Sequence, residues 1–99
     1  MRKMLTPVAV QLPLLFLKER RTHIAYSPAL DLSACGSTQQ KAKENFHTVL
    51  RLFIEELIEH GTLEEVLSEL GWTRQQRDWT PPVTLKKIIC VSMRVPLPV

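Results

Sequence analysis

The sequence has few glycines and few cysteines, three and two among 99 residues. A phosphate-binding loop requires clustered glycines, and here each glycine stands next to the end of an expected helix, which excludes such a loop. A secreted domain held together by disulfides normally has more cysteines than this one. We therefore expect Cys35 and Cys90 to be reduced thiols in a cytoplasmic protein.

The sequence also lacks a cluster of residues that could bind a metal ion. His23, His47 and His60 fall on an expected strand, in the middle of a helix and at a helix end, without metal-binding spacing. Asp31 is the only acid on the expected strands, whereas a magnesium site requires two or more convergent carboxylates. Cys35 lies near a helix start without an expected histidine base, which favours a buried, unreactive thiol. The sequence thus predicts no metal, no cofactor and no enzymatic activity.

No apolar run is long enough to cross a membrane as a helix. Residues 1–3 are basic at two positions and precede an apolar stretch up to residue 17, which superficially resembles a signal peptide. Pro7 and Pro13 interrupt that stretch, and the basic sequence KERR follows it in place of small cleavage-site residues. We expect neither a signal peptide nor a membrane anchor.

The length and composition, with 44% hydrophobic and 23% charged residues, fit one small domain spanning 1–99. Alternating apolar residues predict strands over 6–17, 22–27 and 30–35. The polar turn at 18–21 and the break at Pro28 are short, so these strands should form an antiparallel meander within a core of about residues 5–60.

A long helix should follow the meander. Ser37 and Gln40 fit a capping box, and the helix should run from about Thr38 to His60 before Gly61 ends it. Apolar residues at three- and four-residue steps predict one buried face. The members of this face are Ala42, Phe46, Val49, Leu50, Phe53, Leu57 and Ile58.

A short second helix and an extended tail complete the expected fold. Thr62 and Glu65 form a second possible capping box for a helix within 62–71. In the tail, 72–99, we expect Trp72 and Trp79 to pack in the core or clamp the tail. The last stretch alternates cleanly and predicts a strand whose apolar side is covered by its own sheet or by a second copy. That side consists of Ile89, Val91, Met93, Val95 and Leu97.

Charge is unevenly distributed along a chain whose net charge is +3. Seven of the ten acidic residues lie between Lys41 and Leu70, and ten of the thirteen basic residues lie outside that range. This pattern predicts an acidic helical side, which is either a solvated face or a docking patch for a basic protein through Glu55, Glu56 and Glu59. The alternative partner is nucleic acid. It would bind the basic ends, Arg20, Arg21, Arg74, Arg77, Lys86 and Lys87.

The stretch HIAYSPALDLSACGSTQQKAKENFHTVLRLFIEEL resembles the HicB-like antitoxin family. The similarity is strong over about a third of the chain and looser through GTLEEVLSELGW and the Trp-Pro-Pro tail. Ser37 stands where the family often has an acidic residue, and 39–41 replace its frequent glutamates. The residues that carry the resemblance are Ala25, Tyr26, Pro28, Leu30, Asp31, Gly36, Thr38, Ala42 and Asn45.

The resemblance implies an α+β fold of order β-β-β-α-β, a partial ribonuclease-H-like domain. It also implies a non-enzymatic antitoxin that binds and masks a small, basic, mRNA-cleaving toxin (HicA-like) of a type II toxin–antitoxin system. Many members add a C-terminal DNA-binding unit. Because this sequence ends with the single expected strand ICVSMRVPLPV and no helices follow it, we do not expect operator binding, although that strand could pair with its copy in a homodimer.

Overall fold

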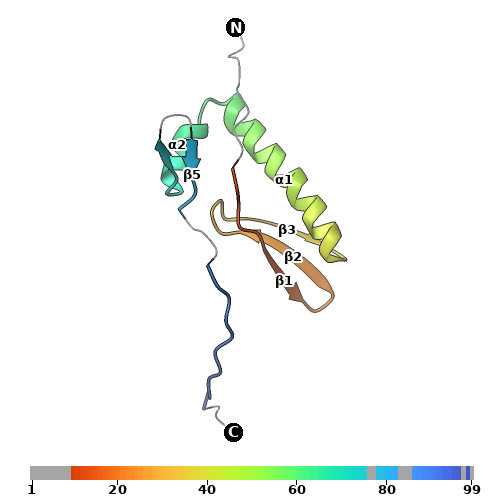
Figure 1. Ribbon diagram of the computed structural model, residues 1–99. Coiled ribbons are helices and arrows are strands. Elements are labelled where there is room, and N and C mark those ends of the chain that lie inside the picture. Colours follow the sequence, from red (N-terminus) through yellow and green to blue (C-terminus); the bar gives the residue numbers. More distant parts are fainter. Residues whose placement is uncertain (1–9, 76–77, 83–85, 97, 99) are drawn as a thin grey trace.

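The computed structural model describes residues 10–75, 78–82, 86–96 and 98, and its fold is α+β, as predicted (Figure 1). A three-stranded antiparallel sheet precedes a long helix, and a short helix and a two-stranded hairpin follow. In chain order the elements are β1 (Leu15–Glu19), β2 (Thr22–Ser27), β3 (Leu32–Gly36), α1 (Gln39–Glu59), α2 (Leu63–Glu69), β4 (Thr73–Gln75) and β5 (Asp78–Thr80).

The sheet has the order β1-β2-β3, and the predicted meander is therefore confirmed. The predicted second strand, 22–27, agrees with β2 at both ends. Within the described residues the first strand begins only at Leu15, which pairs with Tyr26, and none of residues 10–14 is paired with β2. Lys18 and Glu19 belong to β1, so the turn contains only Arg20 and Arg21. Residues 6–9 of the prediction lie outside the described residues.

The third strand begins at Leu32, two residues later than predicted, because residues 28–31 form a turn. Asp31 has a φ of 51°, a left-handed conformation that aspartate tolerates better than most residues. The expectation that Asp31 lies on a strand was wrong. Ala29 and Leu30, in the same turn, are buried.

Helix α1 agrees with its predicted range to within one residue at each end, but its N-cap is Thr38 and not Ser37. The hydroxyl of Thr38 accepts a hydrogen bond of 3.0 Å from the Lys41 amide. At the other end Gly61 has a φ of 67°. Its amide donates to the Ile58 carbonyl and the Thr62 amide donates to the Leu57 carbonyl, which is a Schellman motif.

Helix α2 ends in a second Schellman motif, in which Gly71 has a φ of 92° and the Trp72 amide donates to the Leu67 carbonyl. Its start differs from the prediction, because Thr62 makes no side-chain cap hydrogen bond. A capping box would require Glu65 to accept from the Thr62 amide, and the motif that ends α1 already uses that amide.

Two clusters form the core. In the first, Ala25 and Ala34 of the sheet meet Ala42 and Phe46 of α1, and the small alanine side chains let the helix approach the strands closely. Of the predicted helix face, Ala42 and Phe46 are buried and the others are half-buried, except that Ile58 is 39% exposed and lies outside the core. The second cluster consists of Ala29, Leu30, Leu67 and Trp72.

The tail differs most from the prediction. Strands β4 and β5 pair with each other on either side of the polar stretch between Trp72 and Trp79, where the sequence predicted an extended tail with a polar turn but no paired strands. The predicted final strand is absent, since the described residues 86–96 have no regular secondary structure. Trp72 is buried and Trp79 packs against the second cluster, which agrees with their expected core role. No helix in the described ranges is both long and apolar enough to cross a membrane.

Candidate functional site

The strand-to-helix corner is built by the residues that carry the family resemblance. A Cβ on Gly36 would lie 2.4 Å from the backbone nitrogen of Ala42, so only glycine allows this approach of β3 to α1. Asn45 donates a hydrogen bond of 2.7 Å from Nδ2 to the Cys35 carbonyl oxygen. Together with the Thr38 cap, these contacts dock α1 on the edge of β3.

A second contact within the resembling stretch joins Tyr26 of β2 to Asp31 of the following turn. The Tyr26 hydroxyl donates a hydrogen bond of 2.9 Å to Oδ1 of Asp31. This hydrogen bond raises the pKa of Tyr26 above its ordinary value of 10.0, and desolvation and the negative charge of Asp31 act in the same direction. Asp31 is exposed and serves as the acceptor for this tyrosine, which accounts for its place in the turn.

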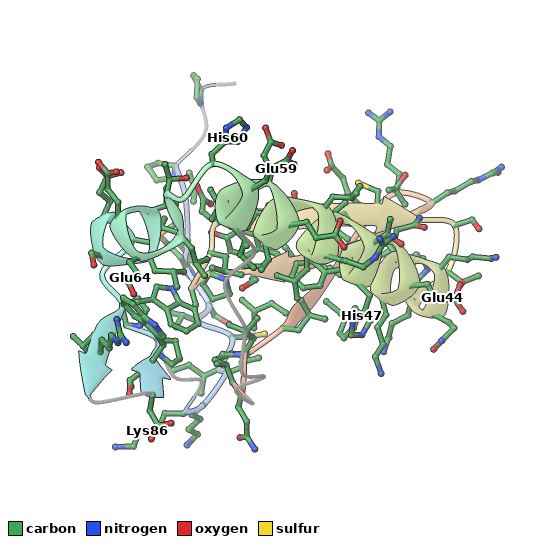
Figure 2. All side chains as sticks on the ribbon, turned by 90° about the horizontal axis from the view of Figure 1, so that it is seen from above. Glu44, His47, Glu59, His60, Glu64 and Lys86 are labelled. Carbon is green, nitrogen blue, oxygen red and sulfur yellow. The ribbon has the colours of Figure 1, made fainter. Side chains whose placement is uncertain are left out.

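The predicted partner-binding residues Glu55, Glu56 and Glu59 are all exposed on α1, and we call them the acidic flank. Figure 2 shows Glu59 and His47 on opposite sides of the helix. Positions 45 and 59 are 14 residues apart, which places them within about 40° of each other around the helix axis. Because Asn45 contacts β3, Glu59 lies towards the β3 side of α1.

Several of these glutamates already have intramolecular partners. Glu55 lies 3.5 Å from Arg51, and Glu56 lies 3.8 Å from His60, both at the i,i+4 spacing. Such exposed pairs are weak and readily exchanged for contacts with another molecule. Glu59 has no ion pair within the described part of the chain. On α2, Glu65 and Glu69 are also exposed.

The basic residues proposed as an alternative nucleic-acid surface come from separate elements. Arg20 and Arg21 form the β1–β2 turn, Arg74 lies on β4, and Lys86 and Lys87 belong to the exposed tail. Arg74 forms an ion pair with Glu64 and lies over the ring of Trp79 at 5.9 Å. Its charge is therefore engaged within the molecule. Arg77 lies outside the described residues.

Candidate catalytic groups do not converge in the described ranges. No group of three or more histidine, cysteine, aspartate and glutamate side chains there could hold a metal ion. A shallow concavity of about 490 Å³ borders α1, but its lining residues, including His47 and Ile54, all come from that one helix. It therefore lacks the opposing wall that usually encloses a small molecule.

Cys35 and Cys90 are free thiols, and both are exposed. The expectation that Cys35 is buried was wrong. Successive side chains of a strand point to opposite faces, and Ala34 occupies the face of β3 that meets α1. Cys35 consequently points to the other face, which no helix covers.

The apolar residues predicted to cover a second copy are highly exposed. Ile89, Val91, Met93 and Val95 are between 56% and 80% exposed. Leu97 lies outside the described residues. In the single chain these four side chains are not covered by the chain's own sheet, and their backbone is not part of a strand.

Comparison with known proteins gave no match among protein-family models, curated proteins or solved structures. The structure itself establishes the α+β class and the antiparallel meander followed by a helix.

Proposed function

We propose that this chain is a non-enzymatic, antitoxin-like protein that binds and masks a small, basic, mRNA-cleaving toxin. The observation that carries the proposal is the strand-to-helix corner. Gly36, Thr38, Ala42 and Asn45, which resemble the HicB-like family, each have a specific role in docking α1 on β3. The order of the first four elements, β-β-β-α, also agrees with that family.

The acidic flank is the proposed contact surface. Its glutamates project from the rigid helix α1, and a basic partner would find complementary charge there without displacing any part of the core. Complementary charge on a partly solvated surface mainly increases the association rate and excludes wrong partners. A small basic protein is therefore the class of partner that this surface fits.

Co-expression with the product of a neighbouring gene for a small basic protein tests the proposal. The wild-type chain should restore growth, and the triple variant Glu55→Lys, Glu56→Lys, Glu59→Lys should restore it less. Folding should persist, because each exposed helix charge contributes only about 0.2–0.5 kcal/mol. Equal rescue by both would remove the acidic flank from the interface. Absence of any toxic neighbour would contradict the antitoxin role itself.

A matched pair of double variants controls for overall charge. Glu55→Lys with Glu59→Lys changes the net charge as much as Glu44→Lys with Asp78→Lys. Glu44 lies 11 residues before Glu55 on α1, a separation of about 16 Å. Only the first pair should impair rescue. If both pairs impair it equally, net charge and not the acidic flank determines the interaction.

The non-enzymatic part of the proposal has its own test. The purified chain should leave RNA and DNA intact when magnesium or manganese is present, because catalysis of this kind uses convergent carboxylates around the metal. Cleavage that disappears in an Asp31→Asn variant would show that the chain is a nuclease.

A further inference from the structure

The sheet has one covered face and one uncovered face. α1 packs on the face formed by Ala25 and Ala34, and Figure 1 shows the helix on only one side of the three strands. Cross-strand partners share a face, so the register places Leu17, Ile24 and Cys35 in one row of the opposite side. Leu15 and Tyr26 form the next row. Ser33, which is polar and exposed, completes that next row. We call the other five residues the outer apolar face.

The outer apolar face is only partly covered within the described part of the chain, where Leu15, Ile24 and Tyr26 are half-buried and Leu17 and Cys35 are exposed. Leu17 is 52% exposed on the edge strand β1, and neither α1 nor α2 packs on this side. A contiguous exposed apolar surface on a folded domain generally marks an interaction site. The question is which molecule covers it.

The same chain has an apolar segment without cover. Residues 86–96, the C-terminal segment, extend away from the sheet and helices in Figure 1. Ile89, Val91, Met93 and Val95 alternate along the segment and are at least 56% exposed. An extended segment with this alternation presents one apolar side, which can pack on the outer apolar face of the sheet.

Charge and length are also complementary. The outer apolar face ends in Glu19, which follows Leu17 on the same side of β1, and in Asp31, which the Tyr26 hydroxyl holds near that face. The C-terminal segment has Lys87 on the same side as its apolar residues, two positions before Ile89, whereas Arg94 alternates to the other side. At about 3.3 Å per residue, the five steps of β2 from Thr22 to Ser27 span about 17 Å, and the six steps from Ile89 to Val95 span about 20 Å.

We propose that the C-terminal segment of a second copy lies across the outer apolar face, and that two copies exchange these segments reciprocally. In the single chain the segment does not cover its own face, because its apolar side chains remain exposed. In a reciprocal exchange the contact forms twice, once for each copy. The total area buried between the two copies then approaches the roughly 1,600 Å² of a stable complex. Pro96 limits further strand pairing, which favours a closed dimer over an open fibre.

The two native cysteines provide a direct test. Cys35 belongs to the outer apolar face and Cys90 to the C-terminal segment, and the chain has no other cysteine. Cys90 alternates to the side of the segment opposite Ile89 and Val91, so a bismaleimide long enough to pass around one extended segment is required. Added to the purified protein, it should give a covalent dimer that is lost in Cys35→Ala and equally in Cys90→Ala. A dimer that persists in either variant would overturn the proposal, because it would show face-to-face or segment-to-segment contact. A link within one chain would also overturn it.

Sedimentation equilibrium measures the energetic contribution of the face. Leu17→Asp should weaken self-association at least about tenfold, because the contact would bury an unpaired carboxylate. Leu52→Asp on α1 is the matched control, since Leu52 is 54% exposed and does not belong to the sheet, and it should change the dissociation constant less than about twofold. Circular dichroism verifies that both variants fold.

Equal effects of the two substitutions, or a wild-type chain that stays monomeric at high concentration, would contradict the exchange. All these measurements require only the purified chain. They are therefore independent of whether the chain neutralises a toxin.

Discussion

The indole of Trp72 donates a buried hydrogen bond of 2.9 Å from Nε1 to the carbonyl oxygen of Ala29, 43 residues earlier in the chain. Ala29 lies in the turn between β2 and β3, and Trp72 directly precedes β4. Leu30 and Leu67 pack beside them in the second cluster. This contact joins the C-terminal elements α2, β4 and β5 to the sheet.

Replacing Trp72 with phenylalanine should destabilise the domain by about 1–3 kcal/mol, because the buried Ala29 carbonyl loses its donor. Urea unfolding followed by circular dichroism measures the change without depending on tryptophan fluorescence. Trp79→Phe is the control, since Trp79 is only half-buried and has no corresponding buried hydrogen bond in the described structure. Equal costs for the two substitutions would show that the hydrogen bond contributes nothing specific.

Phe46 and Phe53 lie seven residues apart on α1, but their burial differs. Phe46 is 3% exposed in the first cluster, and its truncation to alanine should cost about 3–5 kcal/mol. Phe53 is half-buried, so the same truncation should cost roughly half as much, because part of its surface is already in water. Chemical denaturation of both variants provides the comparison. A Phe46→Ala cost below about 1 kcal/mol would place that ring outside the core.

Gly36→Ala tests the close approach of β3 to α1. The added Cβ would contact the Ala42 backbone nitrogen at 2.4 Å, and the resulting shift should cost about 1–3 kcal/mol. Gly61→Asn is the control, because nothing lies within 4 Å of a Cβ there and asparagine adopts a positive φ more readily than most residues. It should cost less than about 1 kcal/mol. Thermal unfolding should therefore rank the Gly36 variant as the less stable of the two.

Tyr26 is the only tyrosine, so the absorbance of its phenolate reports one group. In the folded protein its pKa should lie above 10.0, because the hydroxyl donates to Asp31. The direction in which stability changes with pH follows from the raised pKa of Tyr26 in the folded state. The stabilisation is fully present below the unfolded pKa and is lost as the pH rises through the folded pKa.

Asp31→Gly should lower the pKa of Tyr26 towards its ordinary value, since glycine fits the φ of 51° and provides no acceptor. Asp31→Asn keeps an acceptor without the negative charge and should give an intermediate value. A spectrophotometric pH titration of the three proteins measures the order. An unchanged midpoint in Asp31→Gly would show that the hydrogen bond is not formed in solution.

The elements that could be predicted from the sequence depend on local chemistry. The alternation of residues 22–27 defines β2, and the apolar steps of α1 indicate its length to within one residue at each end. Gly61 and Gly71 mark both helix ends, because a left-handed residue after the last turn is a property of the backbone itself. These signals act over four or five residues, so neighbours in the chain are sufficient to produce them.

The elements that were missed depend on competition between neighbouring groups. Thr38 caps α1 in place of Ser37, and Thr62 cannot form a capping box because α1 already uses its amide. The β4–β5 hairpin lacks a strong turn signal, and its formation accompanies the packing of Trp72 and Trp79 against the second cluster. At both helix starts and in the β4–β5 pair, the local sequence allowed more than one structure. Hydrogen bonds and packing with other parts of the chain determined which one formed.

For the candidate surfaces, the sequence by itself determined which residues are acidic, which are apolar and which resemble an antitoxin family. Only the tertiary structure decided where they lie. Cys35 points away from α1 because Ala34 beside it meets the helix, and Leu17 does so because its neighbour Phe16 shares the helix-facing side with Ala25. Glu59 lies on the β3 side because Asn45 docks that side of α1. The physical reason is that a strand or a helix has two sides of nearly equal local energy, and long-range packing determines which side is buried.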